Sequence, residues 1–396
     1  MKIAVAGAGI GGLSCAYRLA HAGLDVTLFE AGSYFGGHSN TVDVALDGFR
    51  FGVDTGFLVF NERTYPNLAG LFDELGVETA PSEMSFSVKL ARPGAQNLES
   101  AGANLDTVFA QRANLFEPRF LRMVADIVRF NRQAGALARA GAIEPIALGD
   151  WLDAQGYSVQ FRHWYLLPMA ACVWSCPAAQ MLAFPLSTFV RFCHNHGLLQ
   201  VSDRPQWRTV KGGSRNYVDK MLAAICHSDQ ALALLGDARA DERSVLSALR
   251  YQANHAVLHT DASCLPARRK AWPAWNYQSS GGGEGRPEVC VPEVCVHYLL
   301  NKLQPLPCTT PVIVSLNPID PPRHASVLAE FDYAHPVFDA AAIAAQARLG
   351  HLQGTQNTWF AGAWTGDGFH EDGRKSGLAV AASLAGLTMA HQHAAA

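Results

Sequence analysis

The chain has 396 residues, of which 49% are hydrophobic and 16% are charged. Its 31 Lys and Arg residues nearly balance its 34 Asp and Glu residues, so it lacks the strong net charge that attracts nucleic acid. We therefore expect a small-molecule or lipid ligand and no nucleic-acid partner. The length corresponds to roughly two or three domains.

Nine cysteines are scattered along the chain without the CxxC spacing of zinc and redox sites. This pattern is typical of reduced thiols in a cytoplasmic protein. His194 and His196 stand near Cys193, but such a set is too small for a closed metal site, and we expect no metal. No run of about 18 residues is apolar without Gly, Pro or charge, so no membrane-spanning helix is expected.

The first 31 residues predict a strand, a glycine-rich turn, a helix ending at Gly23 and a second strand. An acid, Glu30, ends the second strand and favours NAD or FAD over NADP. A tight turn, a helix N-terminus facing a pyrophosphate and an acid for the ribose hydroxyls are the parts of a dinucleotide site. The candidate glycines form or adjoin a GxGxxG motif: Gly7, Gly9, Gly11 and Gly12.

A second glycine pair, Gly36 and Gly37, follows the acid and precedes residues 49–61, where Gly56 is a further candidate contact. A second glycine-rich turn is expected if the cofactor is long and continues past its pyrophosphate into a ring system, as FAD does. An ordinary hairpin turn explains the pair equally well.

The middle of the chain, residues 65–199, is mostly helical by its apolar period and rich in aromatic residues. Most of these aromatic side chains are expected in the core. Any that line a cavity would favour an apolar, elongated ligand. Residues 251–261, 294–303 and 311–318 predict strands of a substrate domain with its own sheet.

Near the C-terminus, residues 357–365 predict a strand that leads into a turn and a helix beginning near Gly373. The partial positive charge at a helix N-terminus is suited to stabilising the reduced flavin ring. Glu371 or Asp372 is expected to cap this helix, and His370 to face the substrate. The alternative is a surface helix with an acidic N-terminal cap.

The chain resembles the flavin-containing amine oxidase superfamily, and more closely a bacterial group of predicted NAD/FAD-binding proteins similar to the N-terminal part of plant cyclopropane fatty acid synthases. The segments that carry the resemblance include "VAGAGIGGLSCAYRL", "QMLAFPLSTFVRFCHNHGLL" and "WFAGAWTGDGFHEDGRKSGLAVA". It implies an FAD-dependent oxidoreductase linked to fatty acyl modification. It also implies that the ADP half of FAD is held by Gly7, Gly9, Gly12, Glu30, Gly37 and His38, and the isoalloxazine half by Gly362, Asp372 and Gly373.

The chain departs from this family in two places. A strand-turn-strand excursion that usually contacts the adenosine is almost absent between residues 214–223 and 225–235, which would weaken adenosine binding. Amine-oxidising relatives often place a lysine near flavin N5, whereas the matching strand here offers Asn254 and His255. This second departure makes amine oxidation less attractive.

The predicted architecture is α/β: a discontinuous Rossmann-type FAD-binding domain (residues 1–64, 205–250 and 355–396) and a mixed α+β substrate domain (residues 65–204 and 251–354). We expect hydride transfer from an apolar substrate, such as a fatty acyl chain, to flavin, with His370 and Glu371 as candidate catalytic residues. A flavin amine oxidase and a non-catalytic protein with a degenerate FAD site are the alternatives. A lipid substrate would have to leave a bilayer or carrier, so peripheral membrane contact is an expectation.

Overall fold

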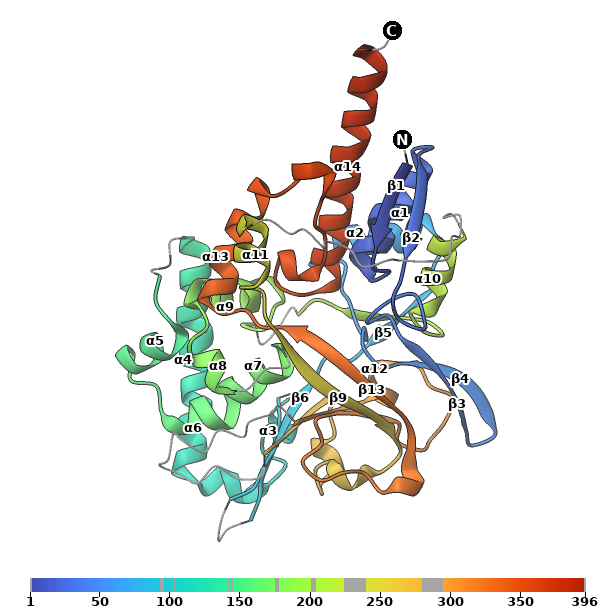
Figure 1. The fold of residues 1–396 in the computed structure, drawn as a ribbon. Coiled ribbons are helices and arrows are strands. Elements are labelled where there is room, and N and C mark those ends of the chain that lie inside the picture. The colour runs from blue at the N-terminus through green and yellow to red at the C-terminus, as the bar shows by residue number, and fades with distance from the viewer. Residues whose placement is uncertain are drawn as a thin grey trace.

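The computed structural model describes residues 2–92, 96–102, 104–141, 143, 145–174, 178–200, 204–223, 240–279 and 295–394. Figure 1 shows both chain ends together at the top, a twisted sheet below them and a group of helices beside the sheet. No helix among these residues combines the length and the apolar character needed to cross a membrane.

The predicted strand, turn, helix and strand at the N-terminus are confirmed. They are β1 (Lys2–Ala6), α1 (Ile10–His21) and β2 (Asp25–Phe29), with β1 and β2 in parallel register. The turn between β1 and α1 begins at Gly7, whose φ of 88° is costly for any residue with a side chain. This unit therefore has the geometry that the GxGxxG spacing predicts.

The predicted strand at residues 357–365 is wrong. Residues 358–362 form no ladder, and two short helical turns flank them, η7 (Thr355–Asn357) and η8 (Ala363–Thr365). Side chains satisfy the backbone groups of this segment instead. The Gln353 amide forms hydrogen bonds with both the backbone N–H and the carbonyl of Phe360, and Ser376 Oγ accepts from the N–H of Gly362. A backbone satisfied by side chains needs no neighbouring strand.

The last long helix, α14 (His370–Ala394), packs along α1, so the two chain ends lie side by side as predicted (Figure 1). The contact depends on glycine, because a Cβ at Gly377 would lie 2.2 Å from the carbonyl oxygen of Gly11. Arg374 is buried at this contact, where it donates to the carbonyl of Asn67 and to the Ser14 hydroxyl. The helix begins at His370, three residues earlier than predicted.

A seven-stranded sheet forms the centre of the lower part, with the order β13-β9-β12-β11-β10-β6-β7. Neighbours pair antiparallel except β6 and β10, which are parallel. The three predicted strands of this region are present as β9, β11 and β12, but the second prediction is wrong at its end, since residues 300–303 form the short helix α12. The strands are β6 (Phe86–Leu90), β7 (Leu98–Ala101), β9 (Tyr251–His259), β10 (Trp275–Ser279), β11 (Cys295–Leu299), β12 (Ile313–Leu316) and β13 (Val327–Pro336).

The helices of the middle segment enclose a core of aromatic side chains, which confirms the prediction that most of these rings are buried. Phe130, Phe161 and Phe189 are almost fully buried there. The helices are α3 (Leu105–Val108), α4 (Pro118–Ala140), α5 (Leu148–Ala154), α6 (Val159–Phe161), α7 (Leu167–Trp174), α8 (Ala178–Leu182) and α9 (Leu186–Asn195).

The remaining elements connect these parts. Asp54, at the end of β4, is buried and accepts hydrogen bonds from Thr41, Ser214 and Gln304, which ties the β3–β4 hairpin to the start of α10. Residues 225–235, where the chain departs from its family, lie outside the described residues. The other elements are α2 (Pro66–Glu74), β3 (Thr41–Leu46), β4 (Phe49–Asp54), β5 (Thr79–Ser82), β8 (Trp207–Val210), α10 (Arg215–Leu222), α11 (Ala240–Leu246), α12 (Leu300–Leu303) and α13 (Ala340–Arg348).

Candidate active site

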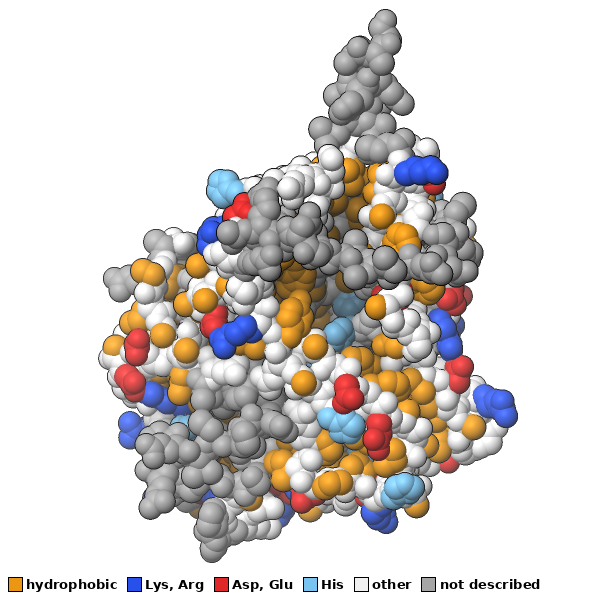
Figure 2. All heavy atoms as spheres, in the orientation of Figure 1, with side chains coloured by type: hydrophobic (Ala, Val, Ile, Leu, Met, Phe, Trp, Pro, Cys, Tyr) orange, Lys and Arg blue, Asp and Glu red, His pale blue; other side chains and the backbone are white. Residues whose placement is uncertain are grey.

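One cavity of about 420 Å³ runs between the two chain ends and the sheet. Its volume lies within the range of small-molecule and cofactor sites. Figure 2 shows a hollow in this part of the surface, with hydrophobic and histidine side chains inside it. Of the predicted site residues, those that line the cavity are Gly7, Gly9, Gly11, Gly12, Gly37, His38, Gly56, Gly362 and His370.

The first glycine turn leaves open space where a ligand can approach the backbone. A Cβ added at Gly7 or Gly9 would have no atom within 4 Å, and Gly9 stands at the N-terminus of α1. A helix N-terminus offers free amides and partial positive charge, which suits a phosphate. Gly12 has another purpose, since a Cβ there would lie 1.8 Å from the carbonyl oxygen of Gly7. Gly12 therefore allows the turn, while Gly7 and Gly9 leave it accessible.

Other predicted glycines bring segments together. A Cβ on Gly37 would lie 3.1 Å from Cα of Gly9, which keeps the second glycine turn against the first. A Cβ on Gly11 would lie 3.1 Å from Cα of Gly362, and one on Gly56 would lie 2.4 Å from the carbonyl oxygen of His38. These positions keep the cavity walls close to one another.

Glu30 lies beside the first glycine turn but does not line the cavity. Its two carboxylate oxygens accept from the backbone N–H groups of Ala8, at 2.7 Å, and Gly32, at 2.8 Å. Each carboxylate oxygen can accept a further hydrogen bond. The acid is thus held at the end of β2, where ribose hydroxyls lie in dinucleotide sites.

His38 presents an unsatisfied polar atom at the cavity. Its Nε2 is buried and has no hydrogen-bond partner, while its ring stacks on Tyr333 and meets the edge of His335. Burial lowers the pKa of His38, so the imidazole is neutral near pH 7. A buried nitrogen without a partner costs free energy unless a ligand satisfies it.

His370 also lines the cavity and is held between two neighbours. Its ring stacks on Phe57 with centroids 3.9 Å apart, and its Nε2 lies 2.9 Å from the Ser39 hydroxyl. Burial lowers the pKa of His370 to about 3. The ring is therefore uncharged throughout the neutral range.

The next three residues do not line the cavity. Glu371 accepts from the backbone N–H groups of Asn67 and Leu68, so it caps α2. Asp372 accepts from the N–H of Phe369, and burial raises its pKa to about 6. A Cβ on Gly373 would lie 2.6 Å from the Ile10 side chain. These three residues position the turn before α14 and pack α14 on its neighbours.

The rest of the cavity is mainly apolar. Its walls come from the sheet and from α7 and α9, and include Met84, Trp174, Phe192, Trp275, Tyr298, Val314 and Leu316. Among the described lining residues, Asp367 is the only carboxylate, and none is lysine or arginine. Burial raises the pKa of Asp367.

Several lining residues were missed by sequence reasoning, among them Tyr333, His335 and His196. Alternation along β13 was a usable signal, because residues two apart in a strand point to the same face. His196 was assigned to a helix end, which is correct, since α9 ends at Asn195. Its ring nevertheless reaches the cavity, and burial lowers its pKa to about 4.

Comparisons with known proteins agree with this geometry. Residues 5–75 match the model of the NAD(P)-binding Rossmann-like domain. Cyclohexylamine oxidase from Brevibacterium oxydans IH-35A is similar over 98% of this chain and 99% of its own, with 16% identity and a TM-score of 0.61. The chain has the amine oxidase fold. This finding supports the resemblance inferred from the sequence.

Two more structures share the amine oxidase fold. Putrescine oxidase, in a structure bound to putrescine, is similar over 97% of this chain and 99% of its own, with 13% identity and a TM-score of 0.57. A fatty acid isomerase from P. acnes that produces CLA is similar over 96% of this chain and 98% of its own, with 13% identity and a TM-score of 0.60. At these identities the likeness establishes the fold alone, so the substrate must be argued from the cavity.

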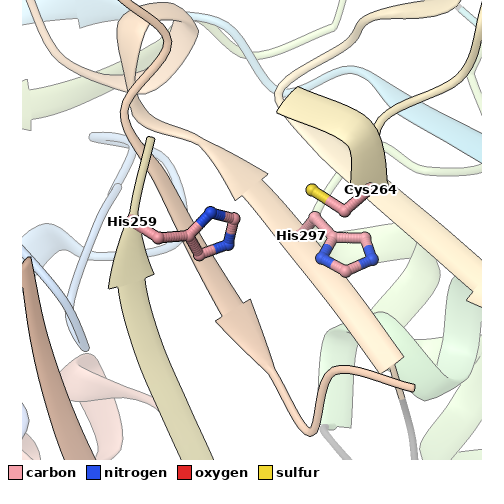
Figure 3. Close-up of side chains that lie close together, drawn as sticks. All are labelled: His259, Cys264 and His297. Carbon is pink, nitrogen blue, oxygen red and sulfur yellow. The ribbon is translucent and has the colours of Figure 1, made fainter. Parts of the chain in front are cut away.

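A separate polar cluster lies on one face of the sheet of this amine oxidase fold (Figure 3). His259 on β9, His297 on β11 and Cys264 in η3 (Ala262–Cys264) offer ligand atoms within 4.8 Å of one another. Ser315, on the strand between the two histidines, places its hydroxyl 2.6 Å from a nitrogen of each ring. The spacing alone would suit a metal ion.

The hydrogen bonds favour a proton-ordered network instead. His259 Nδ1 accepts from the backbone N–H of Asp261, so the ring proton lies on Nε2, toward Ser315. His297 Nε2 donates to Gln278 Oε1, so its Nδ1 accepts from Ser315. A metal at His259 Nε2 would require moving that proton to Nδ1, against the Asp261 N–H. The cluster therefore fits a buried hydrogen-bond network within the sheet better than it fits a metal site.

Proposed function

We propose that the protein is an FAD-dependent oxidoreductase that oxidises an apolar substrate, with a fatty acyl chain as the substrate class. The observation that supports this most directly is the continuous cavity that joins an open dinucleotide turn to a mainly apolar chamber. The match to a Rossmann-like domain and the amine oxidase fold agree with it.

The residues present fit FAD. The open backbone at Gly7 and Gly9 and the N-terminus of α1 would hold the pyrophosphate, with Glu30 at the ribose. The unsatisfied His38 Nε2 and the wall at Gly362 would contact the rest of the cofactor. When bound, the flavin supplies the capacity to accept a hydride.

The chain's own residues then have three tasks. The apolar walls bind and orient the substrate chain and exclude water from the reacting carbon. The N-terminus of α14 stands beside the turn at Asp367–His370 and contributes positive partial charge there. His370, uncharged and hydrogen-bonded to Ser39, is our candidate for accepting a proton at its imidazole; its pKa of about 3 makes it a weak base.

Oxidation of an amine is the second candidate. Asp367 in the cavity wall is a carboxylate that could pair with a substrate ammonium, and the similar structures include cyclohexylamine oxidase and putrescine oxidase. Against it, the described cavity wall contains no lysine. Asn254 is buried and bonded to Asn317 and His335, while His255 bonds Asp332 at the surface. Neither residue replaces the family lysine at the cavity.

The test begins with the visible spectrum of the freshly purified protein and the identity of any bound cofactor. Anaerobic mixing with an unsaturated fatty acid, its acyl ester and a set of simple amines then shows which compound bleaches the flavin. We expect the acyl compounds to do so. Protein that stays colourless after addition of FAD would instead support a non-catalytic protein with a degenerate site.

Asp367→Asn separates the two substrates. If an amine is the substrate, the variant should raise KM roughly tenfold or more, since it loses a charge-assisted contact. If an acyl chain is the substrate, KM should change little. Asp332→Asn is the matched control, because Asp332 is 90% exposed and lies outside the cavity. A tenfold effect for amines confined to Asp367→Asn would overturn the acyl assignment.

A further inference from the structure

Exposed apolar side chains gather on one part of the surface. Of the ten large hydrophobic residues that are exposed among the described residues, five lie between residues 115 and 159. They are Leu115, Phe116, Leu121, Val128 and Val159, on η1 (Arg112–Phe116), α4 and α6. Phe116 is 86% exposed, more than any of the others. Single exposed apolar residues are ordinary, but a cluster of them marks an interaction surface.

The outward face of α4 continues this cluster as a stripe. Leu121, Ala125, Val128, Arg132 and Arg139 are all exposed. With about 100° between successive residues, these five fall within a sector of about 60°. The buried residues of the same helix, such as Phe120 and Phe130, face the core of the helical part. The helix is therefore apolar on its inner face and both apolar and basic on its outer face.

The exposed charge on α4 itself has one sign. Arg122, Arg132 and Arg139 are exposed and form no ion pair with any described residue. The only acid within α4, Asp126, is buried, where it pairs with Arg129 and accepts from the backbone N–H of Ser158. An ordinary solvent-facing helix mixes both signs. This one presents three arginines, Arg122, Arg132 and Arg139, that pair with no carboxylate of the described residues.

We propose that the face formed by η1 and the outer side of α4 docks on an anionic phospholipid bilayer. Apolar side chains with arginines beside them are typical of helices that lie in the membrane interface, where the arginines reach the lipid phosphates. Helix α4 spans about 35 Å, long enough to lie flat along such a surface. The inference rests on this surface alone and is independent of the proposed substrate.

A lipid surface fits better than a protein partner. The exposed residues stand on the outside of a helix, where the apolar side chains of its first half are followed by Arg132 and Arg139 along the same stripe. Single aromatic and aliphatic side chains can each enter the lipid interface, whereas a protein interface needs a packed apolar centre with few charges. The free arginines match the negative potential of anionic lipid.

Vesicle flotation tests the proposal with the full chain. We expect binding to vesicles of phosphatidylcholine mixed with phosphatidylglycerol, weak binding to pure phosphatidylcholine, and loss of binding in high salt. The triple variant R122Q/R132Q/R139Q should lower the partition coefficient by roughly fivefold for each arginine. F116S/L121S should lower it by roughly tenfold or more.

Controls keep the test decisive. Phe49→Ser changes a side chain that is 50% exposed on the β3–β4 hairpin, away from this face, and should bind vesicles as the wild type does. Thermal unfolding shows whether each variant is folded, and the substituted side chains are all exposed. Binding to mixed vesicles that neither variant weakens would overturn the proposal. So would size-exclusion data showing a dimer that F116S/L121S converts to a monomer, because the face would then be a protein interface.

Discussion

Gly9→Ala separates cofactor binding from folding. Gly9 has φ −67° and ψ 174°, which alanine adopts without strain, and the added Cβ meets no protein atom within 4 Å. The free energy of unfolding of the apoprotein should be unchanged or rise by about 0.4–1 kcal/mol, because alanine restricts the unfolded chain. The new methyl group would occupy space that the cofactor phosphates need. Loss of one charge-assisted hydrogen bond costs about 1.5–3 kcal/mol, or roughly 10- to 150-fold in Kd.

The assay pairs urea unfolding of the apoprotein with titration of FAD, followed by the quenching of flavin fluorescence. Gly70→Ala in α2 is the matched control, since a Cβ there also meets open space but lies outside the cavity. Gly12→Ala should destabilise the fold itself, because its Cβ would lie 1.8 Å from the Gly7 carbonyl oxygen. Wild-type affinity for FAD in Gly9→Ala would refute the assignment of this turn to the cofactor.

Three further predictions concern residues around the cavity. Glu371→Ala removes the cap of α2 and should cost about 1–2 kcal/mol in urea unfolding, with the flavin spectrum unchanged. Burial lowers the pKa of His370 from 6.5 to about 3, so the contribution of this neutral histidine to stability is complete above pH 6.5 and is lost as the pH falls toward 3. The free energy of unfolding of His370→Gln, measured over the same pH range, should therefore decrease less than that of the wild type. Burial raises the pKa of Asp54 from 3.8 to about 6, so the free energy of unfolding decreases as the pH rises through this range. Asp54→Asn should lack this pH dependence. It should also be about 1–3 kcal/mol less stable, because one of the N–H or O–H groups that donate to Asp54 would lose its acceptor.

The N-terminal half of the site could be predicted from sequence because its function depends on local backbone geometry. A turn that needs Gly12 to clear the Gly7 carbonyl, followed by a helix, is encoded within a few consecutive residues. In the C-terminal half, only some of the predicted residues line the cavity. His370 lines the cavity while Glu371 points to α2, and one residue of helix rotation, about 100°, decides between them.

The apolar wall could not be assigned from sequence. Met84 and Trp275 meet at the cavity because β6 pairs with β10, nearly 190 residues away along the chain. Likewise, a strand is predicted for residues 357–365, yet the Gln353 and Ser376 side chains satisfy that backbone. Both outcomes depend on partners that are distant in sequence or are side chains, which a local pattern does not report.

The glycine contact between α1 and α14 also sets an order of events during synthesis. Gly11 meets Gly377 and Gly362, so the wall that closes one side of the cavity is made long after the turn that it faces. A nascent chain has the glycine turn of its N-terminal segment, but no wall opposite it, until α14 has been synthesised. If this cavity holds the proposed cofactor, loading must wait for α14, and a chain truncated before α14 should remain unloaded.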